Sequence, residues 1–342
     1  MAKMSLGTKI KLGVSAVLII LVVLNSNPAD VSDAMGQVDL ALIGLVVLLY
    51  MINLCVKAYR WSVLMNATGN KVKFRSIFTA FSLSQAINNL IPGRVVGETS
   101  RIVEMNAKEG VKIGKGLASV VTERIMDFAV LTILCVTSLL LLLVSIVDDL
   151  RGYLIFLVIV MVIVNVFFIY ILAKPSIVKR IAGWGVRLFK RVVKGEKGER
   201  YAEKMMGMVD SFNEAVTYQG EWKPMLWASV LTGAIWVNEI LRLYIIIVAL
   251  GVDVTLVAVI AASSLASLSG VILSAGSGNV VMSSAVFGAA GLDANVAATA
   301  GLLSAITSIW LSVPVSLLAM YLDSRRSKAS STKVQTNCKR DY

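Results

Sequence analysis

Residues 154–173 read LIFLVIVMVIVNVFFIYILA, twenty successive positions without a charged side chain. A helix of about 20 apolar residues is long enough to cross the hydrocarbon core of a bilayer. A second run of this kind occupies residues 130–147. Several such runs exclude an ordinary soluble fold and predict an all-α protein that crosses the membrane many times.

The composition of the whole chain agrees with this prediction. Of its 342 residues, 57% are hydrophobic and 16% are charged, whereas soluble domains carry about 25% charged residues. In a soluble protein the net charge of +12 would point to nucleic acid. In a membrane protein, Lys and Arg gather in cytosolic loops and meet anionic headgroups. We therefore expect membrane lipids, and not nucleic acid, as partners.

Several kinds of chemistry are disfavoured by the residues present. The chain has no histidine, which removes the commonest metal ligand and general base. Cys55, Cys135 and Cys338 are far apart and form no CxxC pattern. We expect no metal and no cofactor, and any catalysis would depend on carboxylates, lysines and hydroxyls.

The apolar runs predict about seven full spans and two shorter elements. The first run follows three lysines in the manner of a signal peptide, but a poor cleavage sequence comes after it, so we expect a retained span. Full spans are predicted at residues 12–24, 40–59, 117–147, 153–173, 225–250, 255–273 and 295–322, and shorter apolar pieces at 77–91 and 280–290. Residues 1–324 would form one transmembrane domain, and residues 325–342 a disordered cytosolic tail.

The charged residues predict the orientation of these spans. The segments 26–38, 148–152, 251–254 and 291–295 contain six aspartates and one basic residue, Arg151. The other connecting segments carry nearly all the Lys and Arg, and Lys57 and Arg60 are assigned to the basic loop that follows span 40–59. Because basic loops stay in the cytosol, we expect a cell-membrane protein with both termini cytosolic.

This orientation makes two elements anomalous. Basic segments flank residues 77–91 on both sides, so this piece would enter from the cytosol and return. Residues 255–273 and 280–290 must together begin and end outside, and the second piece is too short to cross. We predict two re-entrant elements that enter from opposite faces, an arrangement typical of transporters built from an inverted repeat. Two irregular packing elements without a pathway are the alternative.

The basic segment 174–223 contains an amphipathic pattern. Four apolar residues recur at helical spacing, and five cations lie largely elsewhere around the helix. This predicts a helix in the cytosolic headgroup layer, and a solvated linker helix is the alternative. The residues are Ile177, Ile181, Trp184 and Leu188, with Lys179, Arg180, Arg187, Lys190 and Arg191.

Two charges fall near the middle of span 225–250. Glu239 and Arg242 are three residues apart and share a helix face, next to Asn238. A charge at mid-bilayer is expensive, so both side chains should face protein or water. They could form a purely structural pair. Alternatively, Arg242 meets an anionic headgroup, or Glu239 carries a proton.

A break and a charge cluster follow residues 77–91. Pro92 cannot continue a helix interior and Gly93 tolerates unusual backbone conformations. A new helix starting near Val95 would present free N–H groups to an anion, with Arg94 and Arg101 adding charge. The alternative is a capping turn at the interface. Further along, Glu123, Arg124 and Asp127 lie within about one turn, where we expect the cytosolic headgroup zone.

These two motifs together resemble the flippase-like integral membrane family that is related to the transmembrane part of lysylphosphatidylglycerol synthases. The resemblance covers nearly the whole chain. It implies a polytopic protein that moves a phospholipid or glycolipid between leaflets. The positions that match the family's motifs are Asn89, Pro92, Gly93, Arg94, Gly97, Glu98, Arg101, Glu123, Arg124 and Asp127.

The chain departs from the family pattern at two places. The family's C-terminal glycine-rich segment usually ends in Glu, where this chain has Val281 after Gly276 and Gly278. An Arg usual in the last long helix falls near Ala305. Both charges are absent together, which implies that activity or substrate differs from other members. The chain ends soon after residue 322, so lysyl transfer is not expected.

We therefore predict a transporter-like protein, rather than an enzyme, that binds an anionic phospholipid or a lipid-linked glycan carrier between its two re-entrant elements. Arg94, Arg101, Arg124 and Arg242 would receive the headgroup phosphate. Two alternatives remain: a membrane-embedded transferase with Asp127 or Glu123 as base, and an accessory subunit of a lipid or glycan synthase. The supporting residues are Asn89, Pro92, Gly93, Gly97, Glu98, Glu123, Asp127, Asn238, Glu239, Gly276 and Gly278.

Overall fold

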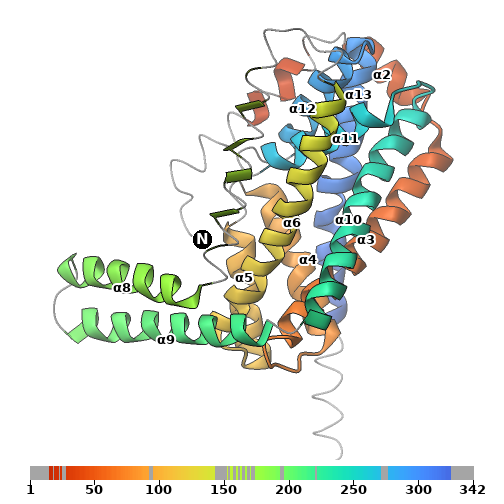
Figure 1. Ribbon diagram of the computed structural model, residues 1–342. Helices are drawn as coiled ribbons and strands as arrows, with labels where there is room; N and C mark the ends of the chain where they lie inside the picture. Colours follow the sequence, from red (N-terminus) through yellow and green to blue (C-terminus); the bar gives the residue numbers. More distant parts are fainter. Residues whose placement is uncertain are drawn as a thin grey trace, which may run out of the picture.

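The computed structural model describes residues 28–91, 95–142, 174–192, 196–219, 222–270 and 276–324, with isolated positions within 15–24 and 152–170. The secondary structure of these residues is helical, without a strand (Figure 1). The chain is an all-α polytopic membrane protein, as predicted. Its helices are α2 (Pro28–Gly36), α3 (Leu40–Asn66), α4 (Phe74–Leu90), α5 (Val95–Glu109), α6 (Ile113–Leu142), α8 (Pro175–Val192), α9 (Glu196–Gln219), α10 (Trp222–Ala249), α11 (Leu256–Ser269), α12 (Ser277–Ala289) and α13 (Ala294–Ala305), followed by the π-helical turn η1 (Ile306–Trp310).

Among the described residues, three helices are long and apolar enough to cross a membrane: Leu40–Asn66, Trp222–Ala249 and Ala294–Ser324. The first two are α3 and α10, which pack side by side along the long axis of the bundle (Figure 1). The third contains α13 and η1 and continues to Ser324. Their outer faces expose large apolar side chains such as Leu48 and Val237, which is the surface expected against lipid.

The start of α3 agrees with the prediction, and its end does not. Asp39 caps the helix by accepting hydrogen bonds from the N–H groups of Ala41 and Leu42. The helix was expected to stop at residue 59, but it continues to Asn66 because Trp61 and Met65 are buried in the bundle. Arg60 is therefore part of a transmembrane helix and not of a loop.

The two anomalous regions each form a helical hairpin. Helices α4 and α5 pack together at one end of the bundle, and α11 and α12 pack together at the other (Figure 1). This arrangement agrees with the predicted pair of broken elements. The predicted full span 255–273 is replaced by the 14-residue helix α11, which is only about 21 Å long. Residues 92–94 and 271–275, which join the helices of each hairpin, lie outside the described residues.

A glycine near the start of the second helix allows each hairpin to close. A Cβ atom on Gly97 of α5 would collide with Ser84 and Asn88 of α4. A Cβ atom on Gly278 of α12 would collide with Ser269 of α11. The two hairpins thus use the same device, although they belong to different halves of the chain. This parallel supports the hypothesis of an inverted repeat.

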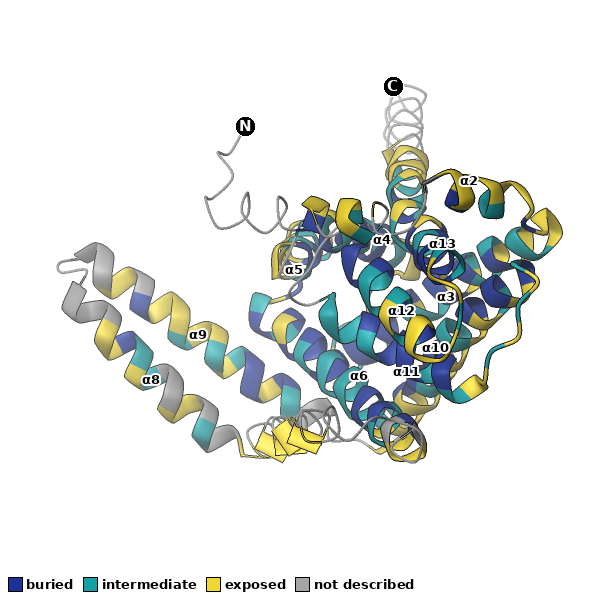
Figure 2. Ribbon diagram, turned by 90° about the horizontal axis from the view of Figure 1, so that it is seen from above, coloured by how far each residue is buried: buried dark blue, intermediate teal, exposed yellow. Residues whose placement is uncertain are grey.

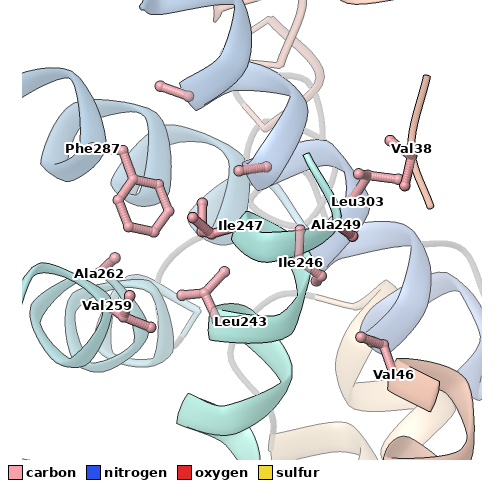
Figure 3. Close-up of a cluster of buried hydrophobic side chains, with 12 residues drawn as sticks. Val38, Val46, Leu243, Ile246, Ile247, Ala249, Val259, Ala262, Phe287 and Leu303 are labelled. Atoms are coloured by element: carbon pink, nitrogen blue, oxygen red, sulfur yellow. The ribbon is translucent and has the colours of Figure 1, made fainter. Parts of the chain in front are cut away.

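Two of the three buried apolar clusters among the described residues lie toward opposite ends of the bundle. Figure 3 shows the cluster beside the α11–α12 hairpin, where Leu243 and Ile247 of α10 meet Val259 of α11 and Phe287 of α12. The other cluster lies beside the α4–α5 hairpin and includes Trp61. Figure 2 shows the buried positions gathered on the inner sides of the helices. Lys57 and Arg60 lie on the same stretch of α3 as Leu54, Ala58 and Trp61 of the second cluster.

Helices α8 and α9 form a hairpin that projects sideways from the bundle (Figures 1 and 2). It leaves the bundle at the same end as the turn between α3 and α4. Its attachment is α9, which packs closely on α6 because Gly114 allows the Met208 backbone to approach. On α8, Trp184 and Leu188 are exposed. The predicted spans 12–24 and 153–173 lie largely outside the described residues, and the tail 325–342 lies wholly outside them.

Candidate functional site

A cavity of about 440 Å³ lies between the two hairpins. Its wall comes from α3, α6, α10 and η1, and from the ends of α4, α5, α11 and α12 that meet inside the bundle. Asn89 and Val95 line it from the first hairpin, and Gly270 and Gly276 from the second. Both predicted re-entrant elements therefore border one cavity. Its charged lining residues are Lys57, Arg60, Glu98, Glu123, Arg124, Asp127, Glu239 and Arg242.

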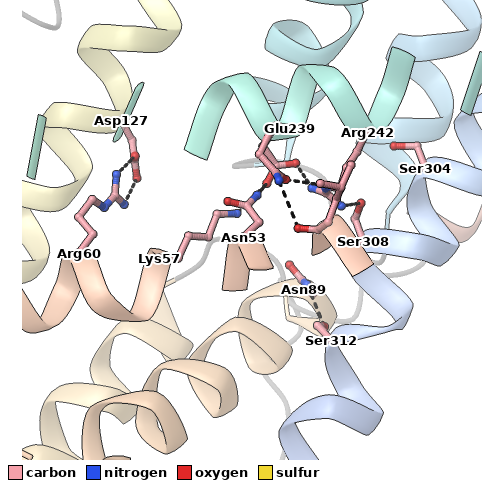
Figure 4. Close-up of polar contacts among 12 residues, drawn as sticks. Asn53, Lys57, Arg60, Asn89, Asp127, Glu239, Arg242, Ser304, Ser308 and Ser312 are labelled. Atoms are coloured by element: carbon pink, nitrogen blue, oxygen red, sulfur yellow. Dashed lines mark hydrogen bonds and ion pairs between the residues drawn. The ribbon is translucent and has the colours of Figure 1, made fainter. Parts of the chain in front are cut away.

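Arg60 is the centre of the first charged cluster. Its Nη1 atom is 2.5 Å from Asp127 Oδ1, and its Nη2 atom is 2.9 Å from Glu123 Oε1 (Figure 4 shows the Asp127 contact). Nη1 also donates a hydrogen bond to Thr232 Oγ1 on α10. The Arg60 and Glu123 side chains are 2% and 1% exposed. These acidic residues thus face the interior of the bundle, and their depth in the headgroup zone stays a prediction.

Arg101 is held in the same cluster but is not one of the residues that line the cavity. Its guanidinium carbon lies 4.6 Å from the centre of the Trp61 ring and 5.1 Å from that of Phe81. It forms ion pairs with Glu98 and with Glu123, the latter at 2.9 Å. The side chain is fully buried and does not line the cavity. Arg101 is therefore placed to fix the two carboxylates rather than to receive a ligand.

Arg124 faces the cavity from α6. Its Nη2 atom is 2.8 Å from Glu98 Oε1, and its side chain is 29% exposed. The cluster as a whole contains three arginines and three carboxylates, so its formal charge is zero. Its members are Arg60, Arg101, Arg124, Glu98, Glu123 and Asp127.

The second charged cluster surrounds Glu239 of α10. Lys57 Nζ lies 2.7 Å from Glu239 Oε1, and Arg242 pairs with the other carboxylate oxygen (Figure 4). Asn53 also donates to Glu239 Oε1, at 2.9 Å. Two cations therefore share one carboxylate, which leaves a formal charge of +1. The predicted Glu239–Arg242 pair is present, and Lys57 joins it from another helix.

Arg242 links this cluster to the last long helix. Its Nη1 atom donates to Ser308 Oγ at 2.7 Å, and its Nε atom donates to Asn238 Oδ1 at 3.2 Å. Ser308 belongs to the π-turn η1. Turns of this type inside α-helices are frequent at functional sites. The tip of the first hairpin reaches the same helix, because Asn89 donates to Ser312 Oγ at 2.9 Å (Figure 4).

The remaining predicted residues occupy the hairpin ends. Gly276 has a positive φ of 86°, and a Cβ atom there would lie 2.8 Å from the Ala305 Cβ atom. Val281 and Ala305, where the resemblance led us to expect charges, lie close in sequence to a neutral contact in which Asn279 donates to Ser304 Oγ at 3.1 Å. Pro92, Gly93 and Arg94 lie outside the described residues. Helix α5 begins at Val95, as predicted.

Sequence reasoning missed Lys57, Arg60 and Asn53. A usable signal was present, since Asn53, Lys57 and Arg60 are separated by four and three residues and so lie on one helix face. The face was not recognised because the span was predicted to end at residue 59, which assigned Lys57 and Arg60 to a loop. Among the described residues, no group of three or more His, Cys, Asp and Glu side chains is arranged to hold a metal ion.

Comparisons with known proteins agree with the fold and the motifs. The family model described as "Lysylphosphatidylglycerol synthase TM region" matches residues 9–316. A UPF0104 membrane protein of Methanothermobacter thermautotrophicus is 28% identical, over 83% of this chain and 86% of its own length. One from Pyrococcus horikoshii is 26% identical, over 81% of this chain and 85% of its own length. No solved structure matches the chain.

Proposed function

Because this chain belongs to the family of the lysylphosphatidylglycerol synthase transmembrane region, we propose that it moves a lipid between the two leaflets of the cell membrane. The lipid would be an anionic phospholipid or a lipid-linked glycan carrier, and its headgroup would enter the cavity between the two hairpins. The observation that carries the proposal is the cluster of Lys57, Glu239 and Arg242, where two cations share one carboxylate.

The charge balance favours an anionic ligand. A net positive charge inside a membrane protein is expensive unless an anion compensates it. The cluster around Arg60 is neutral, whereas the cluster around Glu239 has an excess of one positive charge. A phosphate group beside Lys57 and Arg242 would compensate this excess, and the arginine fork matches phosphate geometry. The phosphate would be released when Lys57 and Arg242 pair with Glu239 again.

The position of each arginine refines its proposed role. Arg242 and Arg124 line the cavity and would contact the headgroup, together with Lys57. Arg101 does not line the cavity and would act by holding Glu98 and Glu123. The role predicted for Arg94, at the start of α5, stays a prediction.

The size of the cavity suits a headgroup. A volume of about 440 Å³ falls within the range of small-molecule sites, which is about 300–1,000 Å³. It is too small for two acyl chains as well, so the tails would remain in the surrounding lipid. The exposed apolar faces of α3 and α10 would contact those tails.

The orientation and the basic hairpin belong to the same proposal. The end of the bundle that carries the α3–α4 turn would face the cytosol, with both termini on that side, because its loops are basic. Helix α8 would then lie in the cytosolic headgroup layer, with Trp184 and Leu188 toward the acyl chains. Both residues are exposed and apolar in the structure.

The enzyme alternative has less support from the geometry. Asp127 and Glu123, the candidate bases, each form ion pairs with Arg60, and a carboxylate so engaged is a poor proton acceptor. An accessory role remains compatible with the fold. It predicts lipid movement or synthesis only when a partner enzyme is present.

The proposal can be tested by identifying co-purified lipids with mass spectrometry. We would compare the wild type with a Lys57→Gln, Arg242→Gln double variant, and use Lys108→Gln as a control because Lys108 is exposed on α5. One anionic lipid class should be enriched in the wild type and the control and lost in the double variant. The enriched lipid would then be assayed for transfer between leaflets in reconstituted vesicles. Equal profiles matching the bulk membrane in all three proteins would refute the headgroup site.

A further inference from the structure

A second, much smaller cavity lies behind the Glu239–Arg242 pair. Its volume is about 30 Å³, and its wall comes from α10, α11, α12, α13 and η1. Most of its lining residues are polar, and five of them are serines. We call it the serine chamber, after its lining residues Ser263, Ser267, Ser283, Ser304 and Ser308, which are joined by Asn279.

Ser283 is the residue that points to a ligand in the chamber. Its side chain is 1% exposed, and its hydroxyl has no hydrogen-bond partner among the described residues. Buried hydroxyls in native proteins are nearly always paired, with protein, water or a bound ion. The next residue, Ser284, behaves differently, because its hydroxyl donates to the Val280 carbonyl at 2.7 Å. The Ser283 hydroxyl is therefore free to bind a polar ligand in the chamber.

The chamber is rich in hydrogen-bond donors. Ser304 Oγ accepts a hydrogen bond from Asn279, and Ser308 Oγ accepts one from Arg242. Since a hydroxyl has one proton to donate in addition to its acceptor sites, both serines can donate into the chamber. Together with Ser283 and the Arg242 guanidinium, they form a set of donors around one small space.

The charge of the residues around the serine chamber indicates whether its ligand is a cation or an anion. Glu239 is the one carboxylate in the described wall, and it already serves both Lys57 and Arg242. The excess positive charge of that cluster repels a cation and attracts an anion at short range. A space of about 30 Å³ holds about two water-sized probes, which is too small for a phosphate group.

We propose that the serine chamber binds a small monovalent anion of the halide class, as a counter-ion to Arg242. The chamber adjoins the headgroup cavity and shares Glu239, Arg242 and four other lining residues with it, so the halide would compensate Arg242 while no headgroup is bound. It would also hold α11, α12 and α13 together on the side of the bundle beyond Glu239.

The test measures thermal unfolding of the full chain in detergent, in sodium chloride and in sodium gluconate at equal ionic strength. Wild-type Tm should rise with chloride concentration and reach a plateau, and bromide should replace chloride. Ser283→Leu, which fills the chamber, should lose the chloride-dependent shift. Ser284→Ala is the matched control on the same helix and should keep it.

Crystallography of the wild type tests the same proposal without a variant that could fail to fold. Bromide-soaked crystals of the wild type should show one anomalous peak within contact distance of Ser283 and Arg242. Equal Tm values in chloride and gluconate, without an anomalous peak there, would mean that the chamber holds only water and would overturn the proposal. A full chloride shift in a folded Ser283→Leu protein would overturn it as well. Neither outcome depends on whether the protein moves lipid.

Discussion

Lys57 and Glu239 are 2.7 Å apart, Nζ to Oε1, although they are separated by 182 residues of sequence. The contact joins α3 to α10, the two long helices that pack side by side. With Arg242 on the other oxygen of the carboxylate, it gives the cavity its excess positive charge. The first prediction concerns the carboxylate that these cations share.

Replacing Glu239 with Gln should increase lipid retention. The change removes the negative charge between Lys57 and Arg242, so an anionic headgroup would face two uncompensated cations. We expect the amount of bound anionic lipid to rise by up to about tenfold, equivalent to about 1.4 kcal/mol, and its release to slow. Mass spectrometry and a vesicle transfer assay would measure both effects.

The control for this prediction is Asp210→Asn. Asp210 also pairs with a lysine, Lys179, but both side chains are more than half exposed, and such pairs contribute little. It should bind lipid like the wild type. Less anionic lipid on Glu239→Gln than on the wild type would contradict the proposed exchange between carboxylate and phosphate.

Arg60→Met should destabilise the protein strongly. The substitution would remove the Arg60 ion pairs of two carboxylates on α6, the buried Glu123 and the partly buried Asp127. Removing one member of a buried ion pair lowers the free energy of unfolding by about 3–5 kcal/mol. Arg75→Met, which removes an exposed partner of Asp323, should lower it by at most about 1 kcal/mol.

The double variant Arg60→Met, Asp127→Asn separates charge from packing, because it removes one cation and one carboxylate and keeps the cluster neutral. Neutralising Asp127 should restore much of the lost stability, as measured by thermal unfolding in detergent. If the double variant is as unstable as Arg60→Met alone, the cluster acts by shape and not by charge compensation.

The sequence predicted the parts of this site that depend on local pattern. Glu239 and Arg242 stand out because two charges interrupt an apolar run, and the hairpin ends stand out because proline and glycine interrupt helices. These signals lie within a few residues of each other. The start of α3 at Leu40 was also predictable, since Asp39 is a preferred capping residue.

The contacts of Arg60 could not be predicted in this way. A cation at the end of an apolar run resembles a loop residue, and only the burial of Trp61 and Met65 shows that α3 continues past it. Its partner Glu123 is 63 residues away and on another helix. Such pairing depends on how helices pack, which one sequence does not reveal.

The close packing of the first hairpin gives a third prediction. Gly97→Ala would place a Cβ atom against Asn88 and Ser84 of α4. Overpacking of this kind costs about 1–3 kcal/mol, so Tm should fall and α4 should move from α5. Gly233→Ala on α10 is the control, because no described atom beyond the neighbouring backbone of α10 lies within 4 Å of the added Cβ. It should be neutral or stabilising by up to about 1 kcal/mol. Equal effects of the two substitutions would show that the α4–α5 contact is looser than described.

The last prediction concerns the depth of α8 in the membrane. Trp184 is 62% exposed and Leu188 is 48% exposed, whereas Lys179 pairs with Asp210 of α9 at 2.8 Å. If α8 lies in the headgroup layer, residues 184 and 188 face the acyl chains while residue 179 faces the other helix of the hairpin. A polarity-sensitive fluorophore on a single cysteine would distinguish these positions. Each labelled variant would also carry Cys55→Ser and Cys338→Ser, so that the introduced cysteine is the one that reacts. Cys135 would be kept because it is buried.

In vesicles that contain anionic lipid, the label on Trp184→Cys or Leu188→Cys should emit at shorter wavelength and be quenched by nitroxide-labelled acyl chains. The label on Lys179→Cys should be quenched little. Because the cations of α8 attract anionic headgroups by about 1 kcal/mol each near the surface, neutral vesicles or high salt should weaken the quenching at residue 184. Equal, weak quenching at all three positions would identify α8 as a solvated linker helix.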